Sequence, residues 1–199
     1  MLTFKNFNIA DWFSFYRVFA APFLILLLWL DERQLFAWFL LISYLTDAID
    51  GYLARKFKIT SPRGSQLDSF GDQITLVVGL IGLLVFENEF IKENLLLIGV
   101  AFVPYIIQMI VAYFKYGKAT AFHTYFAKLS AVIQSVFILH SLFFAPNCTL
   151  FYIMIVFGLL ETLEEITLIF MYDNWASDVK GIYWATKDKR RLKKEQKSK

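Results

Sequence analysis

Six long apolar stretches constrain this chain more than any other feature of its sequence. A helix that crosses the hydrocarbon layer of a membrane needs ~20 mostly apolar residues, and 58% of the 199 residues are hydrophobic. The predicted spans cover residues 12–30, 35–56, 66–86, 94–114, 126–144 and 149–172. We therefore expect an all-α integral membrane protein with six transmembrane helices, because open sheets cannot satisfy their backbone groups in lipid.

The two ends of the chain differ from the spans. Phe4, Phe7 and Trp12 predict an N-terminal segment that lies in the membrane interface before the first span. We treat residues 1–186 as one membrane domain. Residues 187–199 form a basic tail, which is either a solvated end or a clamp on anionic lipid headgroups.

Positive charge is concentrated on one side of the predicted spans. Six spans place the N-terminus, the second and fourth connections and the C-terminus together. Of the 20 Lys and Arg residues, only Arg33 and Lys92 fall on the other side. Because basic residues accumulate on the cytoplasmic side of membrane proteins, we expect both termini to be cytoplasmic, with the protein in the cell inner membrane. The net charge of +3 is modest, and we expect membrane lipids rather than nucleic acid as partners.

Four aspartates lie in the second and third spans, where a structural membrane helix has no need of charge. Asp47 and Asp50 are three residues apart and Asp68 and Asp72 are four apart, so each pair shares a helix face. The short connection of residues 57–65 predicts an antiparallel hairpin with all four carboxylates at one depth. Each charge in the bilayer costs ~2.5–3.5 kcal/mol. Two divalent cations, Mg²⁺ or Mn²⁺, would neutralise the cluster and suit displacement at phosphorus.

Small residues accompany these acids. Gly51 and Ala54 follow Asp50 on the same helix, and they leave its backbone open either to a ligand or to a neighbouring helix. Gly64 either serves the same purpose or is an ordinary turn glycine.

The acids and small residues together resemble the signature of the CDP-alcohol phosphotransferase family. All eight fixed positions of that signature are present with its spacing: Asp47, Asp50, Gly51, Ala54, Arg55, Gly64, Asp68 and Asp72. Residues 8–17 are similar to the Asn-Ile-Pro-Asn…Thr…Arg opening of many members, and they depart from it at Ala10, Asp11 and Ser14.

The resemblance implies a role for each position. Asp47, Asp50 and Asp68 would be the core metal ligands. Asp72 would complete the metal site and act as the base that takes the proton from the attacking alcohol. The CDP moiety would be held by the remaining positions, Gly51, Ala54, Arg55 and Gly64. The family resemblance also implies a homodimer.

Candidate contacts for the acceptor lie in and after the fourth connection. Lys118, His123 and Lys128 could hold a phosphate on the acceptor, or the lysines could reflect only the cytoplasmic excess of positive charge. The region resembles the Gly-Lys…Lys-Thr…Gln pattern of phosphatidylglycerophosphate synthases. It lacks the second lysine of that pattern, and His123 stands near the glutamine position.

The expected reaction is transfer of a phosphatidyl group from CDP-diacylglycerol to an alcohol, with release of CMP, in phospholipid synthesis. The expected acceptor is glycerol 3-phosphate or another phosphorylated polyol; serine, inositol or another amino-alcohol or polyol is the alternative. An ion-coupled secondary transporter is the alternative from a different class, because intramembrane acids also bind coupling ions. Against it, the aspartates lie toward one face and no internal repeat is visible.

Three further acids lie in the last predicted span. Buried acids in a membrane either serve function or pair with a partner. Arg17, Lys128 or His123 could pair with these residues, which are Glu161, Glu164 and Glu165.

Overall fold

The computed structural model describes the backbone of residues 9–57 and 62–187, and the side chains of residues 16–49 and 71–187. The described helices are α1 (Ile9–Trp29), α2 (Arg33–Phe57), α3 (Pro62–Phe86), α4 (Asn88–Glu93), α5 (Leu95–Tyr116), α6 (Tyr125–Phe143) and α7 (Cys148–Met171). Residues 182–187 form one more helical turn, and no strand occurs within the described ranges. The all-α prediction is therefore confirmed for this part of the chain. The interfacial residues before α1 and the tail beyond residue 187 lie outside it.

Each predicted span corresponds to one long helix, and α4 is the helix that the sequence did not predict. The connection expected at residues 57–65 is shorter in the structure, because α2 ends at Phe57 and α3 begins at Pro62. Proline suits the first position of a helix, where its missing N–H has no partner to lose. Gly64 therefore lies inside α3, and its reading as a turn glycine is wrong.

The chain divides into two compact units. The first unit contains α1, α2, α3 and residues 138–146. The second contains residues 92–137 together with α7 and the segment that follows it.

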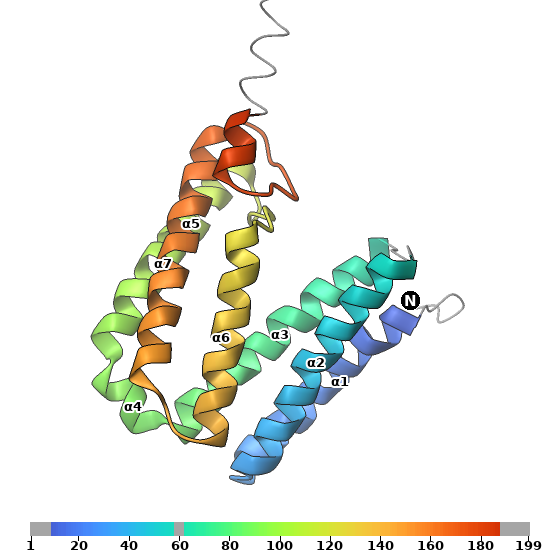
Figure 1. Ribbon diagram of the computed structural model, residues 1–199, viewed down its shortest axis with the longest axis vertical. Helices are drawn as coiled ribbons and strands as arrows, with labels where there is room; N and C mark the ends of the chain where they lie inside the picture. The colour runs from blue at the N-terminus through green and yellow to red at the C-terminus, as the bar shows by residue number, and fades with distance from the viewer. Residues whose placement is uncertain (1–8, 58–61, 188–199) are drawn as a thin grey trace, which may run out of the picture. The chain divides into compact units, whose positions relative to one another are not determined.

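In the first unit α1 packs along both α2 and α3 (Figure 1). Leu24 of α1 and Phe36 and Leu40 of α2 are buried in its core. The start of α2 is fixed by Arg33, whose guanidinium donates hydrogen bonds to backbone carbonyls near the end of α6 and pairs with Glu87. These contacts hold three helix ends together.

In the second unit α5 packs against α7, and the segment after α7 folds back onto the connection between α5 and α6. Asp178 donates its backbone N–H to the Ala121 carbonyl at 3.2 Å, and the Trp175 indole donates to the Ala119 carbonyl at 3.0 Å. The shared core consists of Ala112, Phe122, Leu168, Ile169, Val179 and Ala185. The segment after α7 is thus part of the folded unit.

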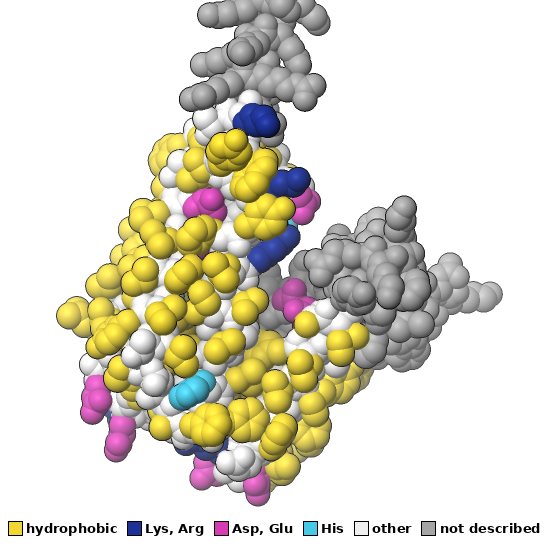
Figure 2. Space-filling view, in the orientation of Figure 1, with side chains coloured by type: hydrophobic (Ala, Val, Ile, Leu, Met, Phe, Trp, Pro, Cys, Tyr) yellow, Lys and Arg dark blue, Asp and Glu magenta, His cyan; other side chains and the backbone are white. Residues whose placement is uncertain are grey.

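Two of the described helices, α5 and α6, are long and apolar enough to cross a membrane by length and composition. The described parts of α1 and α3 add shorter apolar stretches, Tyr16–Trp29 and Gly71–Phe86. Large apolar side chains stand exposed, among them Trp29 (85%), Leu96 (82%) and Phe114 (90%). Figure 2 shows hydrophobic side chains over much of the visible described surface. Such a surface is typical of a protein whose solvent is lipid rather than water.

Candidate active site

Two aspartates of the motif, Asp47 and Asp72, meet at a single arginine. Arg17 of α1 donates from Nη1 to Asp47 Oδ1 on α2 at 2.5 Å, and the same nitrogen donates to Asp72 Oδ1 on α3. The two carboxylates, from helices that the sequence predicted to form a hairpin, therefore converge on one point. The predicted convergence is confirmed for Asp47 and Asp72.

Burial differs sharply between the arginine and its two partners. The Arg17 side chain is 1% exposed, whereas those of Asp47 and Asp72 are 44% and 48% exposed. The guanidinium is therefore shielded from solvent, whereas both carboxylates remain accessible to a ligand. The site thus combines a buried positive charge with accessible carboxylate oxygens that could bind a metal ion.

A glycine on α3 makes room for the buried arginine. A Cβ placed on Gly71 would lie 3.4 Å from Arg17 Nε and 3.5 Å from Arg17 Cζ. The guanidinium therefore rests against the backbone of α3, one residue before Asp72. A side chain larger than a methyl group at this position would occupy the space that the arginine fills.

The other positions of the motif lie on the same two helices. Their side chains are outside the described residues, so only their place in the helices is given. Asp50, Gly51, Ala54 and Arg55 belong to α2, whereas Gly64 and Asp68 belong to α3. Among the described side chains, no group of three or more His, Cys, Asp or Glu converges on one point.

Arg17 is the residue whose role at this site the sequence did not predict. The sequence offers it as one of three possible partners for the glutamates of the last span, and the structure pairs it with Asp47 and Asp72. The signal was present in the sequence. A cation in the first span needs an acid nearby, and the strongest acidic cluster lies in the next two spans.

Two glutamates of α7, Glu164 and Glu165, accept hydrogen bonds from neutral groups within the second unit. Glu165 Oε2 accepts hydrogen bonds from Gln108 Nε2 at 2.6 Å and from Thr120 Oγ1 at 2.8 Å. Glu164 Oε1 accepts from the backbone N–H of Ile182 at 3.3 Å. These bonds join α7 to α5, to the α5–α6 connection and to the last helical turn, which gives these two glutamates a structural role.

The predicted acceptor residues also lie in the second unit. Lys118 Nζ is 3.6 Å from the centroid of the Trp175 ring, a cation–π contact. His123 has a φ of 51° in the connection between α5 and α6. Lys128 lies in the first turn of α6, with its Nζ 6.0 Å from the Tyr125 ring centroid. The segment after α7 thus contacts the connection that carries Lys118.

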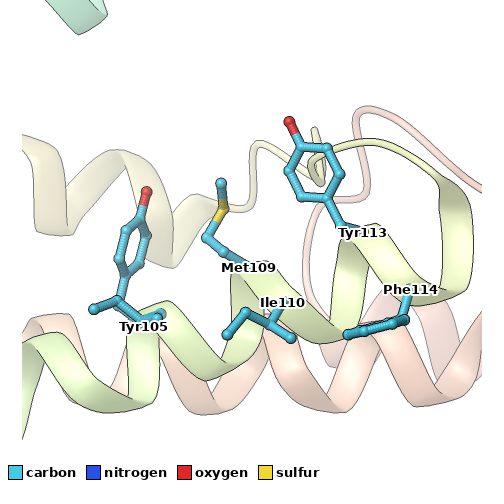
Figure 3. A pocket seen from close by; sticks show the side chains of 6 residues that line it. Tyr105, Met109, Ile110, Tyr113 and Phe114 are labelled. Carbon is cyan, nitrogen blue, oxygen red and sulfur yellow. The ribbon is translucent and has the colours of Figure 1, made fainter.

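A shallow apolar groove on α5 contains no group suited to phosphate chemistry. It is lined by Tyr105, Ile106, Met109, Ile110, Tyr113 and Phe114. Figure 3 shows the rings of Tyr105 and Tyr113 projecting from the same side of the helix, with Met109 between them. The groove fits contact with apolar chains rather than a reaction at phosphorus.

Comparison with known proteins gives one family. The model of the CDP-alcohol phosphatidyltransferase family matches residues 7–175. Among similar proteins, CDP-diacylglycerol–glycerol-3-phosphate 3-phosphatidyltransferases are 27% identical over 89 residues in Rickettsia typhi and 34% identical over 88 residues in Haemophilus influenzae. Each alignment covers 43% of this chain, and 49% and 48% of the respective relative. The matched part of the chain thus spans about half the length of these relatives.

A third relative is a fusion protein of Schizosaccharomyces pombe, named cardiolipin synthase (CMP-forming) / mitochondrial hydrolase. It is 33% identical over 93 residues, which are 47% of this chain and 16% of the fusion protein. No solved structure matches the chain significantly.

Proposed function

We propose, because the chain belongs to the CDP-alcohol phosphatidyltransferase family, that it transfers a phosphatidyl group from CDP-diacylglycerol to a phosphorylated polyol and releases CMP. The observation that carries this proposal is the convergence of Asp47 and Asp72 on Arg17 Nη1. The names of the bacterial relatives favour glycerol 3-phosphate as the acceptor.

The reaction exchanges one bond at phosphorus for another. The acceptor hydroxyl oxygen bonds to the phosphorus that carries the diacylglycerol group, and the bond from that phosphorus to the CMP oxygen breaks. CMP leaves with the electron pair of the broken bond. Asp72 takes the proton of the hydroxyl as general base. Its 48% exposure supports this role, since an acceptor must reach the carboxylate.

The donor set fits a divalent metal. Asp47 and Asp72 offer hard oxygen ligands from two helices to one point, and Mg²⁺ and Mn²⁺ prefer such ligands together with substrate phosphates. Asp50 and Asp68 would complete the set. Two bound ions would supply positive charge to the diphosphate and to the departing CMP.

The remaining site residues are assigned to the two substrates. Gly51, Ala54, Arg55 and Gly64 hold the CDP moiety, as the family resemblance implies. Lys118, His123 and Lys128 hold the phosphate of the acceptor. Charge-assisted hydrogen bonds to phosphate are stronger than neutral ones, so the two lysines would favour a phosphorylated alcohol over serine.

The membrane arrangement is part of the proposal. Six long helices, α1–α3 and α5–α7, occur in the order of the predicted spans. Two of them, α5 and α6, are long and apolar enough to cross a membrane. α7 carries three glutamates. Hydrogen bonds within the second unit offset the free-energy cost of placing two of them, Glu164 and Glu165, in a membrane helix. Both termini and the active site would face the cytoplasm, and the family resemblance further implies a homodimer.

One experiment tests the class and the acceptor together. The purified protein in lipid is given CDP-diacylglycerol with glycerol 3-phosphate, inositol phosphate, inositol or serine, and CMP release is measured with and without excess chelator. We expect release with a phosphorylated polyol, loss on chelation and recovery with Mg²⁺ or Mn²⁺. Full turnover in chelator would refute the metal mechanism, and no release with any acceptor would refute the transferase activity.

A further inference from the structure

Arg17 is placed where a metal-free site would need a cation. Two carboxylates that converge without a counter-ion repel each other, and a buried guanidinium without acids would be an uncompensated charge. Arg17 meets both needs: its side chain is 1% exposed and one of its nitrogens bonds both Asp47 and Asp72. The arginine and the two acids therefore stabilise one another.

The same oxygen atoms are the ones that a metal would use. Arg17 Nη1 contacts Oδ1 of Asp47 and Oδ1 of Asp72. A divalent cation on these oxygens would lie close to the positive guanidinium, and like charges at such separations repel strongly where water is scarce. Full contact of both cations with the same oxygens is therefore unfavourable.

We propose that Arg17 is an internal counter-ion that competes with the divalent metal for Asp47 and Asp72. It holds the two carboxylates together in the metal-free protein, and it gives up their Oδ1 atoms when the metal binds. Arg17 is thus a positioning residue that sets the apparent metal affinity. This inference rests on the proposed function, because the metal belongs to that proposal.

Competition of this kind has a quantitative consequence. The apparent Kd of a ligand equals its intrinsic Kd divided by the fraction of the protein that is competent to bind it. If the aspartates are engaged by Arg17 in about nine of ten molecules, removing the arginine lowers the apparent Kd of the metal about tenfold. A merely structural arginine would lower stability without strengthening metal binding.

The test measures metal binding without substrates. Mn²⁺ is titrated into the full chain in lipid nanodiscs, and the free ion is followed by its electron paramagnetic resonance signal. We expect Arg17→Gln to lower the apparent Kd for Mn²⁺ about tenfold. The metal-free melting temperature of this variant should fall, and its rise on adding Mn²⁺ should exceed that of the parent.

Arg33→Gln is the matched control. Arg33 is also hydrogen-bonded and ion-paired in the first unit, but its partners are Glu87 and the carbonyls of Ser141 and Leu142. This variant should lose stability and keep the parent Kd for Mn²⁺. Arg17→Lys serves where Arg17→Gln does not fold. A single ammonium group bridges two carboxylates less well than a guanidinium, so the Kd of Arg17→Lys for Mn²⁺ should be lower than that of the parent.

The outcomes separate this inference from the proposed function. An unchanged or raised Kd in Arg17→Gln, or in Arg17→Lys where that variant is used, overturns the competition, while metal-dependent CMP release by the parent would leave the proposed function intact. A parent protein that releases CMP and binds no Mn²⁺ overturns both the metal mechanism and the competition.

Discussion

At the scale of single residues, the contact between α2 and α3 depends on a glycine. A Cβ on Gly82 would lie 2.4 Å and 2.7 Å from two ring carbons of Phe36, which is fully buried. Gly82→Ala should therefore force the ring or the helix to move, and overpacking of this kind costs ~1–3 kcal/mol. Thermal melting in detergent should show a lower midpoint than the parent.

The control for this variant is the same substitution in open space. A Cβ on Gly99 of α5 meets nothing within 4 Å, and alanine is favoured over glycine in helices by up to ~1 kcal/mol. Gly99→Ala should keep or raise the melting midpoint. Equal effects of the two substitutions would contradict the close packing of Phe36 on α3.

The catalytic assignment also belongs to a single side chain. Asp72→Asn keeps the shape of the residue but cannot take the hydroxyl proton. Loss of a general base lowers rates by about 10²–10⁴-fold, so kcat for CMP release should fall by that order with both substrates saturating. The effect should appear in kcat because the proton moves only in the transition state.

Asp31→Asn is the matched control for Asp72→Asn. Asp31 lies in the turn between α1 and α2 with a φ of 58°, a conformation that asparagine also adopts readily. This variant should keep kcat. If Asp72→Asn kept kcat within a few-fold of the parent, another group would have to accept the proton.

At the scale of elements, the connection between α5 and α6 is held by the segment after α7. Trp175 binds the Ala119 carbonyl and supports Lys118 through its ring. If Lys118 contacts the acceptor phosphate, Lys118→Ala removes a charge-assisted hydrogen bond of ~1.5–3 kcal/mol. The KM for glycerol 3-phosphate should then rise roughly tenfold or more, and the KM for CDP-diacylglycerol should change much less.

Lys92→Ala is the comparison, because Lys92 lies in α4, on the side assigned away from the cytoplasm. It should leave both KM values unchanged. An unchanged acceptor KM in Lys118→Ala, together with a preference for serine in the acceptor panel, would show that the basic connection serves orientation. The phosphatidyl transfer itself would survive that result.

The sequence predicts the long helices because each contains an extended apolar stretch, although within the described residues only α5 and α6 are long and apolar enough throughout to cross a membrane. It does not predict α4, since a six-residue helix in a polar connection has too few turns to show a period. It predicts that α2 and α3 bring their aspartates together, because the spacing of acids on a helix fixes their shared face.

The partners of the buried charges could not be predicted in the same way. The sequence offers Arg17, Lys128 or His123 as possible partners for the glutamates of the last span. Which acid a buried arginine meets depends on how α1 packs between α2 and α3. That packing is set by tertiary contacts such as Gly71 against Arg17 rather than by spacing along the chain.

At the scale of the whole molecule, the proposed topology rests on six crossings and on the distribution of basic residues. The chain offers its own reporter for this topology, because Cys148 is its single cysteine and is exposed at the start of α7. With a cytoplasmic N-terminus, five crossings precede Cys148 and place it on the outer side. The connection that carries Lys118 follows four crossings and lies on the cytoplasmic side.

A membrane-impermeant maleimide should therefore label Cys148 in sealed right-side-out vesicles without permeabilisation. Lys118→Cys in a Cys148→Ser background should react only after the vesicles are opened, because its thiol faces the lumen. The physical reason is that basic residues resist transfer across the membrane during insertion, and all but Arg33 and Lys92 lie on the proposed cytoplasmic side. Labelling of both cysteines from the same side would mean that α6 does not cross the membrane. Reversed labelling would keep the crossings and place the aspartates on the outer face, away from a cytoplasmic supply of phosphorylated acceptor.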